Sequence, residues 1–206
     1  MVEQREVPKG FHVHVNGGGL VEDTAHVNDT AYIGPDAKVS GYAGVSGDAL
    51  VFGYAEVSGY ARVYGNAIVS GNAQIYGYVE VYGNSKVSDN VKVSGYAEVS
   101  GNAEVCDNAE VSGNAQIYGN AEVGGDAEVY GDAKVYGIER SDGYTFVYVT
   151  CSDGVMRIIA GCRYFTMEEA YAHWEETRGG TALGDETIII LESLKVLSKL
   201  RLDGCV

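Results

Sequence analysis

The sequence predicts a mainly β protein, a parallel β-helix with a small α+β domain at its C-terminal end. Three observations support this fold. A Val or Ile recurs at every sixth position from Val21 to Val135, without an insertion. Ala lies four positions after each of them as far as Ala133, except at Val79, Ser85 and Val91, and Gly usually lies two positions after. The composition agrees, because the 206 residues include 29 Gly and 16 Tyr but only 2 Pro. A repeat this regular determines the fold.

Each six-residue unit, Ala-x-Val-x-Gly-Asn/Asp/Tyr, predicts one short strand and one corner. Ala and Val are two positions apart, so both point to one side of the strand while the x residues point to the other. Gly followed by Asn or Asp suits a corner, since these residues tolerate positive φ. Three units therefore close one triangular coil, so that positions 18 apart in the chain stack on one another. An amphipathic α-helix is excluded, because the β-branched residue never recurs after three or four positions.

The chain divides into three segments. Residues 1–20 contain alternating apolar residues that predict a strand capping the first coil. Residues 21–137 hold the repeat, about six to seven coils that form a prism with three flat faces, roughly 30 Å long at ~4.8 Å per coil. Residues 138–206 begin with a predicted β-hairpin, formed by residues 144–151 and 155–159 around a Ser-Asp-Gly turn.

Two helices are expected after the hairpin. Thr166 and Glu169 form a capping box that opens the first helix. Asp185 is expected to cap the second, although residues 187–191 also read as the start of a strand. We expect this C-terminal domain to close the end of the prism and to contribute to oligomerisation.

The unbroken repeat resembles that of the hexapeptide-repeat left-handed β-helix proteins, over residues 21–137. The resemblance implies a left-handed coil, whereas general crossover rules predict the opposite hand, and it implies a homotrimer. The Gly-Asn-Ala-x-Val run followed by a small Gly-Cys domain is similar to uncharacterised hexapeptide-repeat proteins of phages and prophages. This second likeness implies an accessory protein that engages a host molecule.

The sequence departs from the enzymes of the family it resembles. Its acyltransferases use a His on a coil and usually an inserted loop, and between Val27 and Gly137 there is neither. His26 alone remains as a repeat-borne base. The family's carbonic anhydrases need three zinc-binding histidines, whereas His12, His14 and His26 do not share one face. We therefore expect no catalysis, no cofactor and no metal, with a hexapeptide-type acyltransferase as the alternative.

The charge of the chain excludes some partners. The 29 Asp and Glu outnumber the 14 Lys and Arg, for a formal net charge of -15. Direct binding to nucleic acid or to anionic lipid is not expected, since both need a basic face. No apolar stretch is long enough to span a membrane. The start of the chain shows no apolar leader, and the four Cys lack CxxC spacing, so a cytoplasmic location in a bacterial host is expected.

The acidic residues concentrate in the repeat, where residues 21–137 hold 16 acidic and 5 basic residues. In the later coils Glu occupies outward positions, at Glu98, Glu104, Glu110, Glu122 and Glu128. Such a surface usually keeps a β-rich rod soluble. The alternative is that the acidic rod imitates nucleic acid and occupies a DNA-binding partner.

Tyrosines 18 positions apart are expected to stack in columns along the rod. One column lies at a corner and consists of Tyr42, Tyr60, Tyr78 and Tyr96. A second column, interrupted by Ser100, consists of Tyr64, Tyr82, Tyr118 and Tyr136. Aromatic neighbours stabilise a sheet by ~0.2–1 kcal/mol per pair. Tyr also anchors interfaces, so each column is either cross-strand packing or a recognition strip.

Four outward apolar residues cluster on another face of the early coils: Tyr32, Leu50, Phe52 and Ile68. We expect them to be buried under the N-terminal segment, under the C-terminal domain or at a subunit contact.

The C-terminal domain holds one candidate for chemistry, Cys162 and Arg163 between strand and helix, with His173 downstream. A thiolate near Arg and a helix start is reactive, and Cys with His is the minimum for nucleophilic catalysis. No third orienting group is evident, so a buried structural cysteine is the expectation. The sequence as a whole favours a binding or scaffold protein whose partner is a host protein, or a small nucleotide held between subunits.

Overall fold

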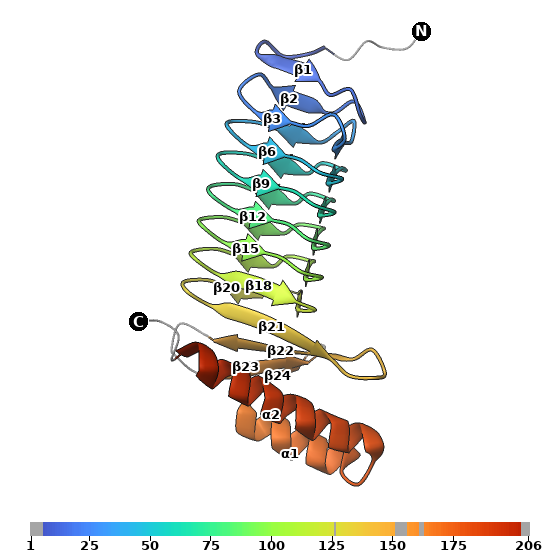
Figure 1. The fold of residues 1–206 in the computed structure, drawn as a ribbon, viewed down its shortest axis with the longest axis vertical. Helices are drawn as coiled ribbons and strands as arrows, with labels where there is room; N and C mark the ends of the chain where they lie inside the picture. The colour runs from blue at the N-terminus through green and yellow to red at the C-terminus, as the bar shows by residue number, and fades with distance from the viewer. Residues whose placement is uncertain (1–5, 126, 151–155, 161–162, 203–206) are drawn as a thin grey trace.

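The computed structural model describes residues 6–125, 127–150, 156–160 and 163–202. Stacked coils form a straight rod, with the N-terminal strands at one end and a short sheet with two helices at the other (Figure 1). The chain is therefore mainly β, a parallel β-solenoid of about six turns with a small C-terminal helical region, as the repeat predicts. Its handedness stays a prediction from the resemblance.

Three sheets form the walls of the rod. The eight-stranded sheet consists of β1 (Phe11–Val13), β2 (Leu20–Glu22), β5 (Lys38–Val39), β8 (Glu56–Val57), β11 (Gln74–Ile75), β14 (Lys92–Val93), β17 (Glu110–Val111) and β20 (Glu128–Val129). The six-stranded sheet consists of β4 (Tyr32–Ile33), β7 (Leu50–Val51), β10 (Ile68–Val69), β13 (Lys86–Val87), β16 (Glu104–Val105) and β19 (Glu122–Val123). The ten-stranded sheet consists of β3 (His26–Val27), β6 (Gly44–Val45), β9 (Arg62–Val63), β12 (Glu80–Val81), β15 (Glu98–Val99), β18 (Gln116–Gly119), β21 (Lys134–Glu139), β22 (Thr145–Thr150), β23 (Met156–Ala160) and β24 (Arg163–Thr166).

Within the rod, neighbouring strands are parallel, and each strand residue pairs with the residue one full coil later. Val63 pairs with Val81, and Val81 with Val99. The corners follow the same register, since the Tyr60 amide donates to the Gly77 carbonyl at 2.8 Å. Equivalent positions of the six-residue unit therefore stack in columns along the whole rod.

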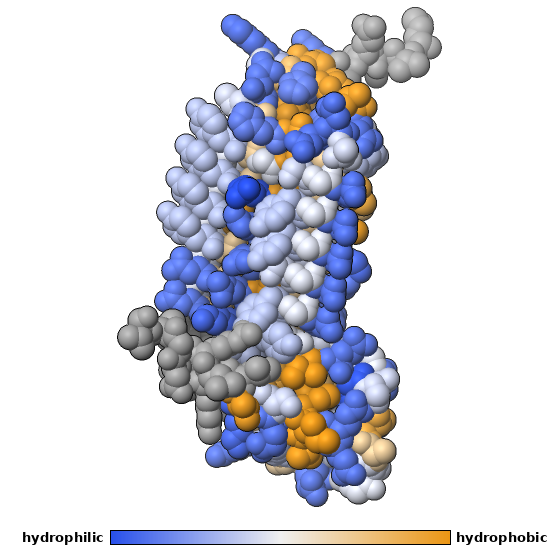
Figure 2. All heavy atoms as spheres, viewed as in Figure 1, coloured by the Kyte–Doolittle hydropathy of each residue, from blue (hydrophilic) through white to orange (hydrophobic). Residues whose placement is uncertain are grey.

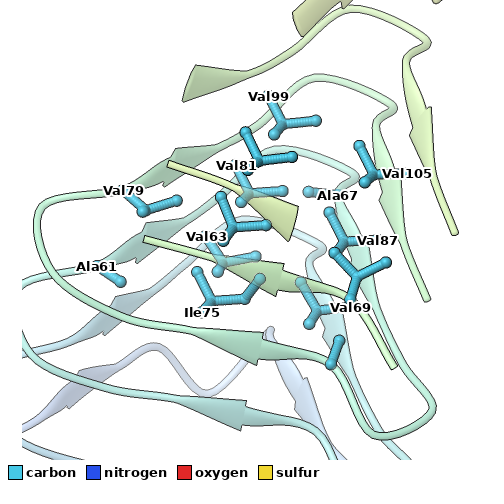
Figure 3. Packing of buried hydrophobic residues seen from close by; sticks show 14 of the residues in the cluster. Ala61, Val63, Ala67, Val69, Ile75, Val79, Val81, Val87, Val99 and Val105 are labelled. Atoms are coloured by element: carbon cyan, nitrogen blue, oxygen red, sulfur yellow. The ribbon is translucent and has the colours of Figure 1, made fainter. Parts of the chain in front are cut away.

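The inside of the rod is filled by the Val, Ile and Ala columns (Figure 3). Val63, Val81 and Ala61 are all 0% exposed. Full burial of a Val side chain contributes ~1.5–3 kcal/mol, so the repeated columns account for the stability of strands that are very short. One coil differs, because Val79, Ser85 and Val91 replace all three of its Ala residues and are likewise buried.

Gly is favoured at the corners because the backbone there has a positive φ and because the next coil approaches closely. Gly59 has a φ of 71°, and a Cβ there would lie 2.9 Å from the backbone nitrogen of Gly77. Asp89 and Asp107 occupy the same position with φ of 62° and 61°. Their carboxylates accept amide hydrogens of the next coil, at 3.3 Å from Asp107 to Asp89 and 2.7 Å from Gly125 to Asp107. Asp tolerates positive φ when its short side chain bonds locally.

The two ends of the rod are closed differently. At the N-terminal end, β1 pairs antiparallel with β2. At the other end, β21 continues beyond the last coil and pairs antiparallel with β22. Val147 and Val149 of β22 pack into the core of the rod, whereas Phe146 and Tyr148 point to the other side and join a second core under the helices.

The C-terminal helices cover that second core. Helix α1 (Met167–Arg178) starts at the predicted capping box of Thr166 and Glu169. Helix α2 (Ala182–Leu202) includes residues 187–191, so the alternative of a strand there is wrong. Asp185 lies within the first turn of α2 and does not cap it. The β-branched run favours a strand locally, but Thr187, Ile190, Leu191 and Leu194 share a helical face that is buried.

An arginine fixes α2 to the end of the rod. Arg140 is only 3% exposed, and two of its nitrogens bond the carboxylate of Asp142 at 2.9 and 2.8 Å. Its third nitrogen donates to Thr187 Oγ1 of α2 at 2.8 Å. The bond to Arg140 lowers the pKa of Asp142 to about 2. Among the described residues, no helix is long and apolar enough to cross a membrane.

Candidate binding surface

Four tyrosines stack along one corner of the rod. We call Tyr42, Tyr60, Tyr78 and Tyr96 the corner column. Each follows a corner Gly with positive φ, at Gly41, Gly59, Gly77 and Gly95. Successive ring centroids are 5.3, 4.9 and 5.0 Å apart, and the rings are nearly parallel, with interplanar angles of 13°, 2° and 6°. The predicted column is therefore present, and its spacing follows from the stacking of the coils.

The corner column is open to solvent. Its residues are 59%, 50%, 53% and 65% exposed, in chain order. The ring faces cover one another, so the column presents ring edges and a row of hydroxyls. None of these four hydroxyls forms a hydrogen bond to another described residue.

The second set of tyrosines is engaged within the fold. We call Tyr64, Tyr82, Tyr118 and Tyr136 the strand column, and all four are half-buried on the ten-stranded sheet. The Tyr64 and Tyr82 rings stack at 4.9 Å, and those of Tyr118 and Tyr136 tilt by 53° at 5.3 Å. The Tyr64 hydroxyl donates to Glu80 at 3.0 Å, and the Tyr82 hydroxyl donates to Glu98.

These bonds change the acidity of the strand column. Burial, together with the bond to Glu80, raises the pKa of Tyr64 to about 12. The bond to Glu98 and then burial raise the pKa of Tyr82. Glu80 and Glu98 are direct neighbours in the sheet, where like charges destabilise the pairing. The hydroxyls of Tyr64 and Tyr82 donate to these two carboxylates and offset the repulsion, so these two tyrosines have a structural role.

The other two corners carry mainly asparagine, with Tyr54 as an isolated tyrosine above Asn72. On one corner, Asn66, Asn84, Asn102 and Asn120 are joined by amide hydrogen bonds of 3.0, 3.1 and 3.0 Å. On the other, Asn72, Asn90 and Asn108 are joined at 2.9 and 3.0 Å. Even the tyrosine corner reverts to this pattern in later coils, where Asn114 donates to Asp132 at 2.8 Å. Corner geometry therefore does not require tyrosine.

The apolar cluster lies on the six-stranded sheet near the N-terminal end. Tyr32 pairs with Leu50, and Leu50 pairs with Ile68. Phe52 is 38% exposed and the other three are half-buried. Of the three predicted covers, the N-terminal segment contacts Tyr32, because a Cβ at Gly17 would lie 2.9 Å from that ring. The C-terminal domain lies at the opposite end of the rod (Figure 1). A subunit contact stays a prediction.

The visible surface of the molecule also has hydrophobic residues near the N-terminal end of the rod. They gather at the N-terminal end and over the C-terminal domain, and the coils between carry mainly hydrophilic and intermediate side chains (Figure 2). The corner column belongs to this middle part by sequence, so it is an aromatic strip on a polar rod.

Acidic residues of the late coils stack on one another. Lys86 pairs with Glu104, and Glu122 lies next to Glu104 in register. Lys92 pairs with Glu110 at 2.8 Å on the eight-stranded sheet, and Glu128 follows Glu110 in the same way. The ion pairs raise the pKa of both lysines. In each column the first Glu is paired with Lys, and the second Glu lies next to the first without a Lys on its own strand position.

The candidates for chemistry are scattered. His26 is exposed on β3, His12 is exposed beside Asp23 at 3.1 Å, and His14 is buried. No group of three or more His, Cys, Asp and Glu among the described residues is arranged to hold a metal ion. Arg163 is exposed and bonds the ring of His173, which stacks on Phe165 at 5.1 Å. Cys162 lies outside the described residues.

The difference between the two tyrosine columns was missed from the sequence. A signal was present, because stacking by three units brings Glu80 next to Arg62 and Glu98 next to Glu80, beside the strand column and away from the corner. An acceptor beside Tyr64 and Tyr82 could be inferred from that period.

A short stretch of the repeat matches the model of a known family. Residues 61–77 match the model of the YdcK beta solenoid repeat. The matched stretch is about one coil and runs from β9 through β11. No curated protein matches the chain. With the fold, the match shows that the chain is a β-solenoid repeat protein.

Proposed function

We propose that this chain is a non-catalytic binding protein that holds a partner through its corner column. The observation that supports this is the contrast between corners. Ladders of Asn amides join most of the side chains on two corners, whereas the third exposes four stacked tyrosines whose hydroxyls have no described partner. Tyr contributes large, rigid contact area and a hydrogen-bonding group, which is why it recurs in binding hot spots.

The resemblance to hexapeptide-repeat proteins supports a more specific form of the proposal, with a family type, a location and a partner. The Ala-x-Val-x-Gly unit supports a protein of the hexapeptide-repeat type, and its phage-like arrangement supports an accessory role in the cytoplasm of a bacterial host. A homotrimer formed through the apolar cluster, with a host protein as partner, is part of the same proposal. A small nucleotide held between subunits is the other ligand class.

Native mass spectrometry of protein purified gently from a bacterial host tests the role of the corner column. Three chains are compared: wild type, the Tyr60→Asn/Tyr78→Asn double variant, and the control Tyr54→Asn. Asn suits both corners, since Asn114 occupies the equivalent position below Tyr96 and Asn72 the position below Tyr54. Tyr54 is 69% exposed on a different corner.

We expect a passenger that wild type and Tyr54→Asn retain and the double variant loses. A passenger that stays with all three chains would exclude the corner column as the binding surface. The mass of the passenger distinguishes a protein from a nucleotide, and the same spectra give the number of subunits.

The stacked carboxylates of the late coils favour one second candidate, the imitation of nucleic acid. Glu104 and Glu122, and Glu110 and Glu128, keep like charges adjacent at a cost to the fold. Replacing Glu104, Glu110 and Glu122 with Lys would abolish capture of a DNA-binding partner if mimicry is the function. Unchanged capture would eliminate this candidate.

A further inference from the structure

We infer that the occupant of the corner column is a basic, proline-rich segment in the polyproline II conformation. The inference rests on the proposed function and specifies its partner. It depends on the period of the column, on its free donors and on the net charge of the whole chain.

The period of the column discriminates between ligand conformations. Two steps of the column, from Tyr60 to Tyr96, join centroid spacings of 4.9 and 5.0 Å. A polyproline II helix has three residues per turn at ~3.1 Å each, so one turn spans about 9.3 Å and nearly matches two steps. A β-strand repeats each face every ~6.6 Å, which fits neither one step nor two.

The row of hydroxyls distinguishes an α-helical ligand from a polyproline II ligand, because its donors need free acceptors on the ligand. An α-helix has a pitch of ~5.4 Å, close to one step, but its carbonyls are bonded internally. The carbonyls of polyproline II have no internal partner and are free to accept from Tyr60 and Tyr78. The exposed ring edges provide apolar contact for proline rings. Aromatic surfaces bind such segments well because the ligand conformation is preformed, so little entropy is lost.

The net charge of the chain indicates whether the occupant is a different molecule or a second copy of this chain. Another copy would match the spacing of the column, yet it also carries a net charge of -15. Two such rods repel each other, whereas lysines or arginines in a ligand are attracted to the acidic rod. Charge therefore favours a basic ligand over self-association.

Fluorescence anisotropy with a labelled peptide of three Pro-Pro-Lys repeats tests the inference at low salt. A peptide of three Gly-Gly-Lys repeats has the same length and charge but is flexible. We expect the proline peptide to bind wild type about ten-fold more tightly than the glycine peptide. The Tyr60→Asn/Tyr78→Asn variant, which removes both rings and hydroxyls, should lose more than ten-fold of that affinity, and Tyr54→Asn should keep it.

A Tyr60→Phe/Tyr78→Phe variant keeps the stacked rings and removes only the hydroxyls. The loss of two hydrogen bonds predicts that affinity falls about ten-fold. This variant also serves if the Asn substitutions disturb the fold, which circular dichroism would show.

Two results would overturn the inference. Equal affinity for the proline and glycine peptides would show that only charge attracts the peptide, and that the polyproline II conformation is not recognised. Sedimentation that shows wild-type oligomers, dissociated by the double variant, together with no peptide binding, would assign the column to contact between copies. The proposed function would still stand if the passenger in native mass spectra depends on Tyr60 and Tyr78, so the two failures are distinguishable.

Discussion

Tyr60 and Tyr64 are close neighbours in one coil, yet their hydroxyls have different surroundings. The Tyr60 side chain projects from a corner and is 50% exposed. Tyr64 follows the buried Val63 on a strand, and its hydroxyl bonds Glu80 at 3.0 Å. The position of a residue within the six-residue unit therefore decides whether its polar group serves the fold or faces solvent.

The surroundings of Tyr64 predict how stability depends on alkaline pH. Its pKa is raised from 10.0 to about 12 in the folded chain, so the folded state keeps this proton where the unfolded state loses it. The free energy of unfolding should therefore fall as the pH rises from 10 to 12. Urea unfolding at a series of pH values measures this, and Tyr64→Phe should show a smaller fall than wild type over the same range.

Two glycines predict opposite effects of the same substitution. Gly59 has a φ of 71° and a tight contact with Gly77, so Gly59→Ala should destabilise the protein by more than ~1 kcal/mol. Gly44 lies on a strand, and a Cβ there would have nothing nearer than 3.9 Å. Gly44→Ala should stabilise the protein by ~0.4–1 kcal/mol. Thermal unfolding of both variants gives the comparison, and equal shifts would contradict it.

At the scale of the coil, packing inside the rod works in layers. The coil that carries Val79, Ser85 and Val91 has larger side chains at all three narrow positions than the coils above and below it. Ser85 avoids an unpaired hydroxyl by donating to the Tyr82 carbonyl at 2.9 Å. The three substitutions occupy one layer, so the layer is packed as a unit.

Exchanging Val and Ala between neighbouring layers should destabilise the rod in either direction. Val79→Ala removes two buried methyl groups and leaves a cavity, at a cost of ~2 kcal/mol. Ala97→Val adds the same volume to the next coil, where Ala97 is 1% exposed, and overpacking costs ~1–3 kcal/mol. Denaturation with guanidinium chloride measures both. A double variant that recovers stability would show that the layers compensate for each other.

The coil could be predicted from the sequence, and the C-terminal domain could be predicted only in part. The six-residue period predicts the strand and the corner, and the return of Tyr at Tyr60, Tyr78 and Tyr96 agrees with three units per coil. The helical state of residues 187–191 depends on contacts with distant residues, such as that of Thr187 with Arg140, which no local pattern reveals. Strand β24 was also not predicted, although it pairs with the strand just before it in the chain, β23. At the binding surface, the positions of both tyrosine columns were predicted, but the acceptor of Tyr64 was not.

At the scale of the whole molecule, negative charge accumulates toward the C-terminal end of the rod. Glu122 and Glu128 occupy the last coils of their columns, next to Glu104 and Glu110. Their repulsion acts through solvent, so dissolved salt screens it.

The stacked carboxylates predict that salt stabilises the molecule. We expect the melting temperature to rise with sodium chloride concentration. At low salt, Glu122→Gln/Glu128→Gln should raise the melting temperature, with a gain in the free energy of unfolding of ~0.2–1 kcal/mol per pair. The melting temperature of this variant should also depend less on salt. Differential scanning calorimetry at several salt concentrations tests both expectations. A melting temperature that falls with salt would instead show that the ion pairs of Lys86 and Lys92 dominate.

Three units make one coil, and both ends of the rod are closed. The surface columns therefore stay in line only if the rod contains whole coils. Loss of three consecutive units would shorten the wall by one rung and return every later side chain to its original face. Loss of a single unit would keep every strand intact yet rotate the rest of the molecule by one face, so that Tyr78 and Tyr96 would no longer continue the line of Tyr42 and Tyr60. A change of length by three units therefore keeps every surface column in line, whereas a change of one unit keeps the strands and interrupts the columns.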